Sequence, residues 1–405
     1  MNKIKFLSLS LVALLMACFT ACENKYEAEH PAELVGTWTC LTNGYVEALV
    51  IKADGSALST GYDGEDYWEN VAGNIVVKNG TIKMTFEDGD NFEGHFDIVA
   101  GVAFSIYTEE GVRLTFNYCA EDLSEEVVGM WVSHNGATDE ENDAAIMTFS
   151  DNGKLTFTGF SPMESDFVVK SEDDYKVVGD IMFITTQVDG VAMKNASRIV
   201  ITPNASAYGD IMVNYVYRMG ESVPTPTSFL RVKEGLNFTG QTYDYISAHV
   251  TNAKGKDEDF TILGHTFNIA KIGAGDFDMM LRSVLFCLDT DANSIKQHFL
   301  VDGVEGNIET PIAVDGNKVT IDYSDVNPAL RKVDMYMFQS ANDSQLHIYM
   351  PTASAVNYLA NLEFVTLLTE GKINPDDSTA IEKFYTDMEA RVESINVSMV
   401  FKARN

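Results

Sequence analysis

Apolar and polar residues alternate through most of the chain beyond residue 30, with the two-residue period of half-buried β-strands. The segment Val112–Tyr118 shows the pattern clearly, because Leu114 and Phe116 share one face with its two end residues. Asn-Gly and Asp-Gly pairs separate such runs, and Asn79–Gly80 suits the tight type I′ turn of a hairpin. Between about residues 33 and 119, about eight such short strands at spacings of roughly 8–12 residues predict a small sandwich or an up-and-down barrel.

The clearest internal feature is a repeat. The segment Glu33–Trp38 recurs as Glu126–Trp131, and both copies end in Gly-x-Trp. Each copy leads into an alternating strand, Ala48–Lys52 in the first and Ala145–Phe149 in the second, and each strand ends at a tight turn. Two copies of one element order about 90 residues apart indicate duplication of a small β unit.

The remainder of the chain, from about residue 236, lacks the Gly-x-Trp motif and ends differently. Its predicted strands are Phe260–Ile269, Val284–Leu288, Lys318–Tyr323, Asp334–Gln339 and Gln345–Met350. Two helices follow: Ala353–Leu368 is apolar nearly all round, and the second presents an apolar stripe from Ile381 to Val392. A last alternating strand, Ile395–Phe401, closes the chain, so we expect the helices to lie across a barrel mouth or a sheet face.

The first residues have the layout of a secretory signal. Lys3 and Lys5 precede an apolar run, Phe6–Ala17, which is too short to span a bilayer and is followed by small residues. The end of the run resembles a bacterial lipobox, which predicts cleavage before a cysteine that carries diacylglycerol. Cys22 lies at the end of the run, directly before an acidic segment, and is the predicted lipidation site. Cys18 is the alternative.

These patterns divide the chain into six segments. Pro224 and Pro226 predict a stiff joint after the second unit, because proline removes a backbone donor and fixes its own φ. The predicted organisation is a signal peptide at 1–21, a lipidated tether at 22–32, β domains at 33–119 and 126–218, a linker at 219–235, and a C-terminal β-rich domain with helices at 236–405.

Composition adds strong acidity to this picture. The sequence has 28 Lys and Arg against 60 Asp and Glu, a net charge of −32, with a hydrophobic content of 45% that is typical of a folded protein. Phosphate backbones repel so acidic a chain, so nucleic acid is not an expected partner. The expected partners are a membrane, through the N-terminal lipid, and a small molecule, a glycan or a protein.

Three cysteines remain beyond the predicted signal: Cys40, Cys119 and Cys287. The first and last strands of an up-and-down barrel are neighbours, which would bring Cys40 and Cys119 close in an oxidising compartment. Alternation favours the opposite outcome, because Cys40 shares the face of Trp38 while Cys119 is out of phase with the apolar face of its own strand. We therefore predict three free thiols.

The Gly-x-Trp motif at Gly36–Trp38 and Gly129–Trp131 resembles the opening motif of lipocalins, and the chain is most similar to the lipocalin-like lipoproteins of Bacteroidota. The resemblance covers about residues 33–218. It implies tandem small up-and-down β-barrels, anchored by lipid to the outer membrane and facing the periplasm or the cell surface. It also implies that the two motif tryptophans are core anchors closing the barrels, with a basic side chain such as Arg113 over the first.

Local signatures of catalysis and of metal binding are absent from the sequence. The seven histidines are widely separated, and no Cys-x-x-Cys, Gly-x-Ser-x-Gly or His-Glu-x-x-His sequence occurs. We therefore expect no catalytic residue, no bound metal and no cofactor. The segment Asp289–Asn293 resembles the start of a calcium loop, but Ser294 and Leu300 stand where that loop requires glycine and glutamate.

The segment Asp63–Trp68 places two aromatic rings beside several carboxylates. Flat rings stack on the apolar face of a sugar, and carboxylates accept hydrogen bonds from its hydroxyls. Tyr67 and Trp68 are therefore candidate ligand-binding residues, and the alternative is a strand start that buries Trp68. Asp377–Thr379 matches the short O-glycosylation tripeptide of exported Bacteroidota proteins.

Three functions follow from these observations. The first is a lipid-anchored extracytoplasmic binding protein, and the second is a structural or interaction lipoprotein whose first two domains are spacers. An enzyme is the third and least supported. A binding protein should contain a cavity of a few hundred Å³ with convergent polar groups, whereas a spacer should have filled cores.

Overall fold

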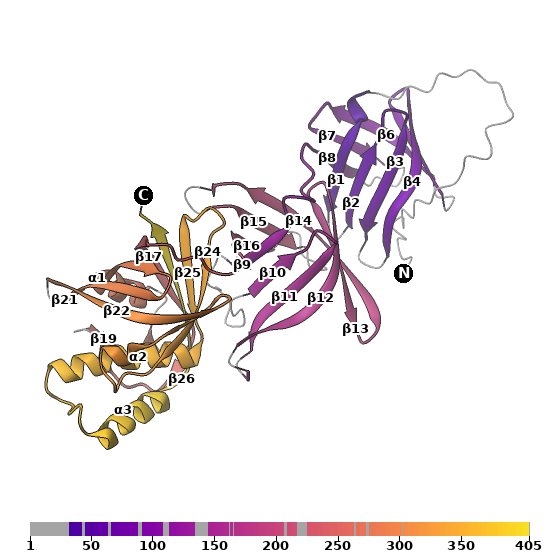
Figure 1. Ribbon diagram of the computed structural model, residues 1–405. Helices are drawn as coiled ribbons and strands as arrows, with labels where there is room; N and C mark the ends of the chain where they lie inside the picture. The colour runs from indigo at the N-terminus through magenta and orange to yellow at the C-terminus, as the bar shows by residue number, and fades with distance from the viewer. Residues whose placement is uncertain are drawn as a thin grey trace.

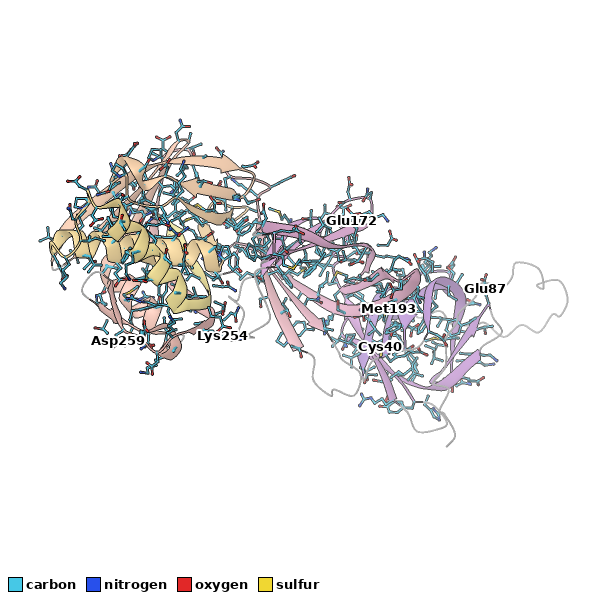
Figure 2. The ribbon with its side chains drawn as sticks, turned by 90° about the horizontal axis from the view of Figure 1, so that it is seen from below. Cys40, Glu87, Glu172, Met193, Lys254 and Asp259 are labelled. Atoms are coloured by element: carbon cyan, nitrogen blue, oxygen red, sulfur yellow. The ribbon has the colours of Figure 1, made fainter. Side chains whose placement is uncertain are left out.

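In a computed structural model the chain forms three closed, eight-stranded antiparallel barrels that follow one another in an elongated row (Figure 1). Figure 2 shows the same row from a second direction, with Cys40 in the first barrel, Met193 in the second and Lys254 in the third. The predicted mainly β class, with two helices before the final strand, is confirmed. The structure describes residues 32–42, 45–63, 66–87, 91–107, 113–133, 145–161, 163–164, 166–205, 209–216, 225–262, 265–272, 275–301 and 303–404.

Barrel 1 pairs its strands in sequence order, and the last strand closes on the first. Its strands are β1 (Gly36–Thr42), β2 (Tyr45–Ile51), β3 (Ser56–Tyr62), β4 (Tyr67–Lys78), β5 (Thr81–Phe86), β6 (Asn91–Val99), β7 (Ala103–Tyr107) and β8 (Arg113–Cys119). The predicted turn at Asn79–Gly80 joins β4 to β5, with φ of 53° and 76° as a type I′ turn requires. Trp38 is fully buried, and its indole Nε1 donates to the carbonyl of Leu34 at 2.8 Å.

Barrel 2 repeats this arrangement with an eighth strand that the sequence did not reveal. Its strands are β9 (Gly129–Ser133), β10 (Ala145–Phe149), β11 (Lys154–Ser161), β12 (Asp166–Val178), β13 (Ile181–Val188), β14 (Val191–Thr202), β15 (Ile211–Val216) and β16 (Thr225–Val232). The segment 219–235, predicted as a linker, contains β16, which pairs with β15 and closes on β9. Pro226 is accommodated in this strand, although proline lacks a backbone donor.

Barrel 3 is also closed, but its chain makes two excursions. Its strands are β17 (Gln241–Gly255), β20 (Leu285–Asp291), β21 (Ser294–Val301), β22 (Val304–Asp315), β23 (Lys318–Ile321), β24 (Val333–Gln339), β25 (Gln345–Met350) and β26 (Val392–Ala403). The first excursion follows β17 and holds β18 (Phe260–Ile262), β19 (His265–Phe267) and α1 (Asp276–Val284). A continuous strand at Phe260–Ile269 was therefore a wrong prediction.

The second excursion holds the two predicted helices, α2 (Thr352–Thr369) and α3 (Ser378–Arg391), which lie beside β26 (Figure 1). Tyr358 of α2 joins Leu288 and Phe401 around an interior void of only about 10 Å³, too small for more than one water. The interior of barrel 3 is therefore filled by its own side chains, and α2 covers one of its ends.

An apolar junction joins barrel 1 to barrel 2. Its buried members are Val46, Ala48, Ile181 and Phe183. Lys176 also pairs with Glu69 across the junction, with Nζ and Oε1 3.2 Å apart. Gly179, in the turn before β13, lies so close to β1 that an added Cβ would meet Thr37 at 2.9 Å. The two barrels are thus fixed by close packing as well as by the chain connection.

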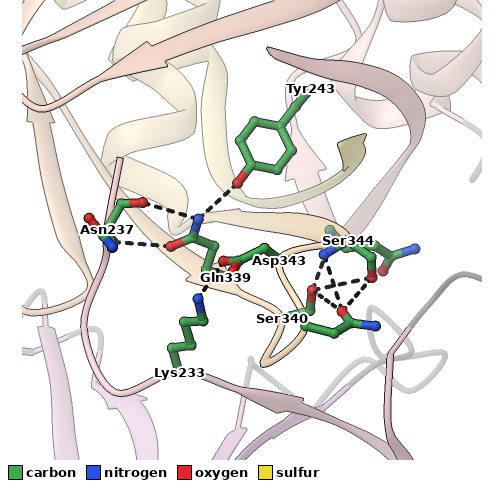
Figure 3. A network of polar contacts seen from close by, with 9 residues as sticks. Lys233, Asn237, Tyr243, Gln339, Ser340, Asp343 and Ser344 are labelled. Atoms are coloured by element: carbon green, nitrogen blue, oxygen red, sulfur yellow. Dashed lines mark hydrogen bonds and ion pairs between the residues drawn. The ribbon is translucent and has the colours of Figure 1, made fainter. Parts of the chain in front are cut away.

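Barrel 2 is joined to barrel 3 by a segment bound along its length to the β24–β25 hairpin (Figure 3). The backbone nitrogen of Lys233 donates to the carbonyl of Gln339 at 2.9 Å, and its Nζ pairs with Asp343 at 2.5 Å. The Gln339 side chain accepts from the backbone of Asn237 at 3.0 Å and donates to the Tyr243 hydroxyl at 2.9 Å. This passage is therefore a fixed connection between the barrels.

Candidate functional site

A cavity of about 790 Å³ lies where α2, α3 and β26 of barrel 3 meet the tip of barrel 2. This volume falls within the range of about 300–1,000 Å³ that small-molecule sites occupy. The lining residues are Phe160, Asn252, Thr320, Lys332, Asp334, Tyr336, Pro351, Thr352, Ala353, Ser354, Val356, Asn357, Glu389, Val392, Glu393, Ser394 and Asn396. Phe160 comes from barrel 2, and all the other lining residues belong to barrel 3 and its two final helices.

Two aromatic rings from different barrels form one wall. Phe160 of β11 and Tyr336 of β24 lie with ring centroids 6.1 Å apart in an edge-to-face arrangement. The Tyr336 hydroxyl donates to Asp166 at 2.6 Å, which ties barrel 3 to barrel 2 beside the cavity. Burial and the adjacent Asp166 carboxylate raise the pKa of Tyr336, so the phenol stays protonated at neutral pH. The wall is therefore rigid and uncharged.

Buried polar groups form another part of the lining. Asn396 is only 5% exposed, and its Oδ1 lies 3.4 Å from the Thr352 hydroxyl, which in turn accepts from the backbone of Ile395 at 3.2 Å. Thr352 begins α2, so this contact fixes the start of the helix against β26.

A bulge in β17 places a second amide, that of Asn252, at the cavity. The register with β26 shifts between Thr251 and Lys254, and Asn252 has φ of 52°. The Ser394 hydroxyl donates to the Asn252 carbonyl at 2.6 Å and holds the bulge in place. Bulges often redirect a side chain toward a site, and asparagine tolerates positive φ better than most residues.

The charged groups of the lining are mostly acidic. Asp334 accepts from the Thr320 hydroxyl at 2.6 Å and pairs with Lys318 at 3.3 Å, while Glu389 pairs with Arg331. These partners hold the carboxylates in place, and Lys332 is the cation that lines the cavity. Oriented carboxylates, amides and hydroxyls can hydrogen-bond a polyhydroxylated ligand, while the exposed edges of the largely buried Phe160 and Tyr336 rings supply a small apolar part of the wall.

The two candidate residues Tyr67 and Trp68 lie elsewhere, in barrel 1 and at its junction with barrel 2. Trp68 is 5% exposed and donates from Nε1 to the Ser59 hydroxyl at 2.7 Å, as the strand-start alternative expects. The Tyr67 ring meets Phe183 of barrel 2 at 5.9 Å and lies under the Lys194 ammonium at 4.3 Å. Neither residue lines the cavity.

Barrel 1 also buries a carboxyl group that the sequence did not single out. Glu47 is 1% exposed and accepts hydrogen bonds from the hydroxyls of Tyr45 and Ser59, the second at 2.5 Å. Burial raises the pKa of Glu47, although these two hydrogen bonds oppose the shift. In sequence Glu47 is one acidic residue in an alternating strand, and acidic residues are common throughout this chain.

Both motif tryptophans are buried core anchors, as predicted, but their basic neighbours differ from the expectation. Arg113 lies over the Tyr107 ring at 5.5 Å, so its predicted place over Trp38 is wrong. In barrel 2 the Arg231 guanidinium lies 4.5 Å from the centre of the Trp131 ring. Arg231 belongs to β16, the strand that was predicted as part of a linker.

The structure describes some of the cysteines named in the predictions, but not all of them. Cys40 and Cys119 are free thiols, and the register places Cys119 opposite Thr37. Cys18 and Cys22 lie outside the described residues, so lipidation stays a prediction. Among the residues that the structure describes, no helix is long and apolar enough to cross a membrane.

Comparison with known proteins gives only distant matches. Neither a protein-family model nor a curated protein matches the sequence. Among solved structures, a double mutant of the vaccine antigen transferrin binding protein B from Haemophilus parasuis Hp5 is 11% identical, with 89% of this chain and 65% of that chain covered and a TM-score of 0.22. Isotype 1 of the same protein from serogroup B Neisseria meningitidis is 8% identical, with 89% and 66% covered and a TM-score of 0.21.

The chain thus spans slightly less than two thirds of the length of these structures.

Proposed function

We propose that this chain is a lipid-anchored extracytoplasmic binding protein, and that its ligand is a glycan that occupies the cavity between barrels 2 and 3. The cavity carries the proposal: its volume of about 790 Å³ suits a short oligosaccharide, and its lining combines two rings with amides, hydroxyls and carboxylates. Anchoring through Cys22 would hold it at the outer membrane, since an exported chain with two or more acyl groups stays bound there.

The lining is suited to ligand binding. Ion pairs with Lys318 and Arg331 hold the carboxylates of Asp334 and Glu389 in place as hydrogen-bond acceptors. The carboxylates are therefore assigned to ligand orientation.

The cores of barrels 1 and 2 favour an additional structural role. Trp38 and Trp131 are fully buried among their neighbours, and apolar side chains pack at both junctions between barrels, including Leu230 of barrel 2 with Phe338 of barrel 3. The first two barrels then act as rigid spacers that hold the cavity away from the membrane, which combines the binding and spacer hypotheses in one molecule.

A thermal-shift panel tests the glycan assignment. The mature protein is heated with maltotriose, cellotriose, mannotriose or triacetylchitotriose, and with sorbitol as control for the general stabilisation by osmolytes. A trisaccharide at 100 times its Kd adds about 2.7 kcal/mol of stability, which raises the midpoint of barrel 3 by about 5–10 °C. If no trisaccharide exceeds the sorbitol control, the assignment of these glycans to the cavity is wrong.

A further inference from the structure

Three residues with different metal-binding atoms meet on the outer face of barrel 3, away from the cavity. Cys287 and Asp289 are two residues apart on β20, so their side chains share one face, and Cys287 lies opposite His298 on β21. The thiol, the carboxylate and the imidazole all lie within 4.8 Å of one another. Figure 1 labels β21, the strand that carries His298, near α1.

We propose that Cys287, Asp289 and His298 form a binding site for a divalent transition-metal ion of the zinc class, with a fourth position open to water or to an external ligand. Thiolate, imidazole and carboxylate together are a ligand set that zinc prefers, whereas calcium takes oxygen ligands alone. Three protein ligands and an open position are typical of zinc sites that are not purely structural.

The cluster is already arranged as a metal-free site would be. His298 Nε2 lies 2.7 Å from Asp289 Oδ2, so one proton occupies the space between two of the proposed ligands. The other oxygen of Asp289 accepts from the Thr242 hydroxyl at 2.7 Å, which fixes the carboxylate from β17. Burial opposes ionisation of Asp289, but these hydrogen bonds outweigh it and hold the pKa of the carboxyl below its usual range.

Two cations lie near the cluster. Arg404 is bonded to both oxygens of Asp244 and is also hydrogen-bonded to the Cys287 thiol, while Lys296 pairs with Glu309 at 3.0 Å. A metal ion would replace the contact of Arg404 with the sulfur, and both cations would keep their carboxylate partners. Cys287 is 3% exposed, and the ion would approach from the side of His298 and Asp289, which are more accessible.

The same three residue types also occur in cysteine nucleophile sites, but the thiol here is unsuited to that role. Cys287 is buried and its thiol is hydrogen-bonded to Arg404, so an external substrate has little access to the sulfur. Reactive cysteines lie instead in partially exposed surroundings.

In the segment Asp289–Asn293, which resembles the start of a calcium loop, the two acidic side chains have different partners. Asp289 turns toward His298, while Asp291 accepts from the backbone of Ala292 at 2.6 Å in the β20–β21 turn. The three residues of the cluster do not form a sequence motif for zinc, because pairing of β20 with β21, rather than close spacing in the sequence, brings His298 to Cys287.

Cobalt titration of the mature, chelator-treated protein tests the site, because Co²⁺ bound by a thiolate gives an intense near-ultraviolet absorption band. We expect one Co²⁺ per chain with this band, and its loss when Zn²⁺ is added in competition. Cys287→Ser should remove the band, and His298→Gln should weaken Co²⁺ binding by at least tenfold. The matched controls are Cys119→Ser and His249→Gln, which should behave as wild type.

Thr242→Val tests the site even if the ligand variants fail to fold, because it keeps all three ligands and removes only the hydroxyl that orients Asp289. It should bind Co²⁺ with the thiolate band but about 10–100-fold more weakly. Circular dichroism in chelator compares the folding of every variant. Absence of the thiolate band in the wild-type protein, or its persistence in folded Cys287→Ser, would overturn the proposal.

Discussion

Removal of the Trp131 indole tests how barrel 2 is held together. Trp131 is fully buried, its Nε1 donates to the Val127 carbonyl at 2.8 Å, and Arg231 lies over its ring. Truncation of a buried tryptophan to alanine costs about 3–5 kcal/mol. Trp131→Phe keeps an aromatic ring under the guanidinium but leaves the Val127 carbonyl unpaired, at a cost of about 1–3 kcal/mol.

A chain of three barrels need not unfold in one transition, so the measurement must report each barrel separately. Hydrogen exchange followed by mass spectrometry of peptides does so. Under conditions where exchange reports local stability, Trp131→Ala should speed exchange of protected amides in β9–β16 by about 10²- to 10⁴-fold. Trp131→Phe should have an intermediate effect.

Trp38→Ala is the matched control, because Trp38 makes the same indole contact with Leu34 in barrel 1. It should speed exchange in β1–β8 and leave the protected amides of β20–β25 unchanged. Unaltered protection of β9–β16 in Trp131→Ala would refute the conclusion that this tryptophan anchors barrel 2.

Two further predictions concern the anchor and barrel 1. Mass spectrometry of the mature protein should find diacylglycerol on Cys22, and Cys22→Ala should release the chain from membranes; lipid on Cys18 would contradict this. Because burial raises the pKa of Glu47 and favours its neutral form, wild-type stability should fall as the pH rises from about 4 through the folded-state pKa. Glu47→Gln should therefore unfold at higher denaturant concentration than wild type at pH 7 but not at pH 3, and an equal difference at both would refute the reasoning.

Features with a local physical cause were predictable from the sequence. The Gly-x-Trp repeat marked two barrels, and the Asn79–Gly80 turn follows from the backbone freedom of those residues. The first helix was expected at Ala353–Leu368 and is found at Thr352–Thr369. The second helix was expected around the apolar stripe from Ile381 to Val392 and is found at Ser378–Arg391, where Asp377 caps its start by accepting from two backbone nitrogens.

Features that depend on distant partners were not predictable. β16 was predicted to be part of a linker because it contains Pro226 and follows Pro224, and its strand character comes from pairing with β15 and β9. The closed form of barrel 3 was not predicted, because two short strands and a helix separate β17 in the sequence from β20, its neighbour in the sheet.

The candidate site could not be predicted either, because residues far apart in the sequence form it. The cavity lining draws Phe160 from barrel 2 and Asn252, Tyr336 and Asn396 from three strands of barrel 3, so no local pattern contains the site. Tyr67 and Trp68 did form such a pattern, and packing at the core and junction of barrel 1 uses both rings.

Filling the cavity tests the central claim, that ligand binds between barrels 2 and 3. Ala353 is exposed on α2 and lines the cavity, so Ala353→Trp places an indole in the ligand's space without removing a buried contact. Met279→Trp, at an exposed position of α1 in the same barrel, is the matched control. Isothermal titration with the stabilising trisaccharide should show wild-type affinity for Met279→Trp and at least a hundredfold loss for Ala353→Trp, whereas wild-type affinity in folded Ala353→Trp would contradict the account.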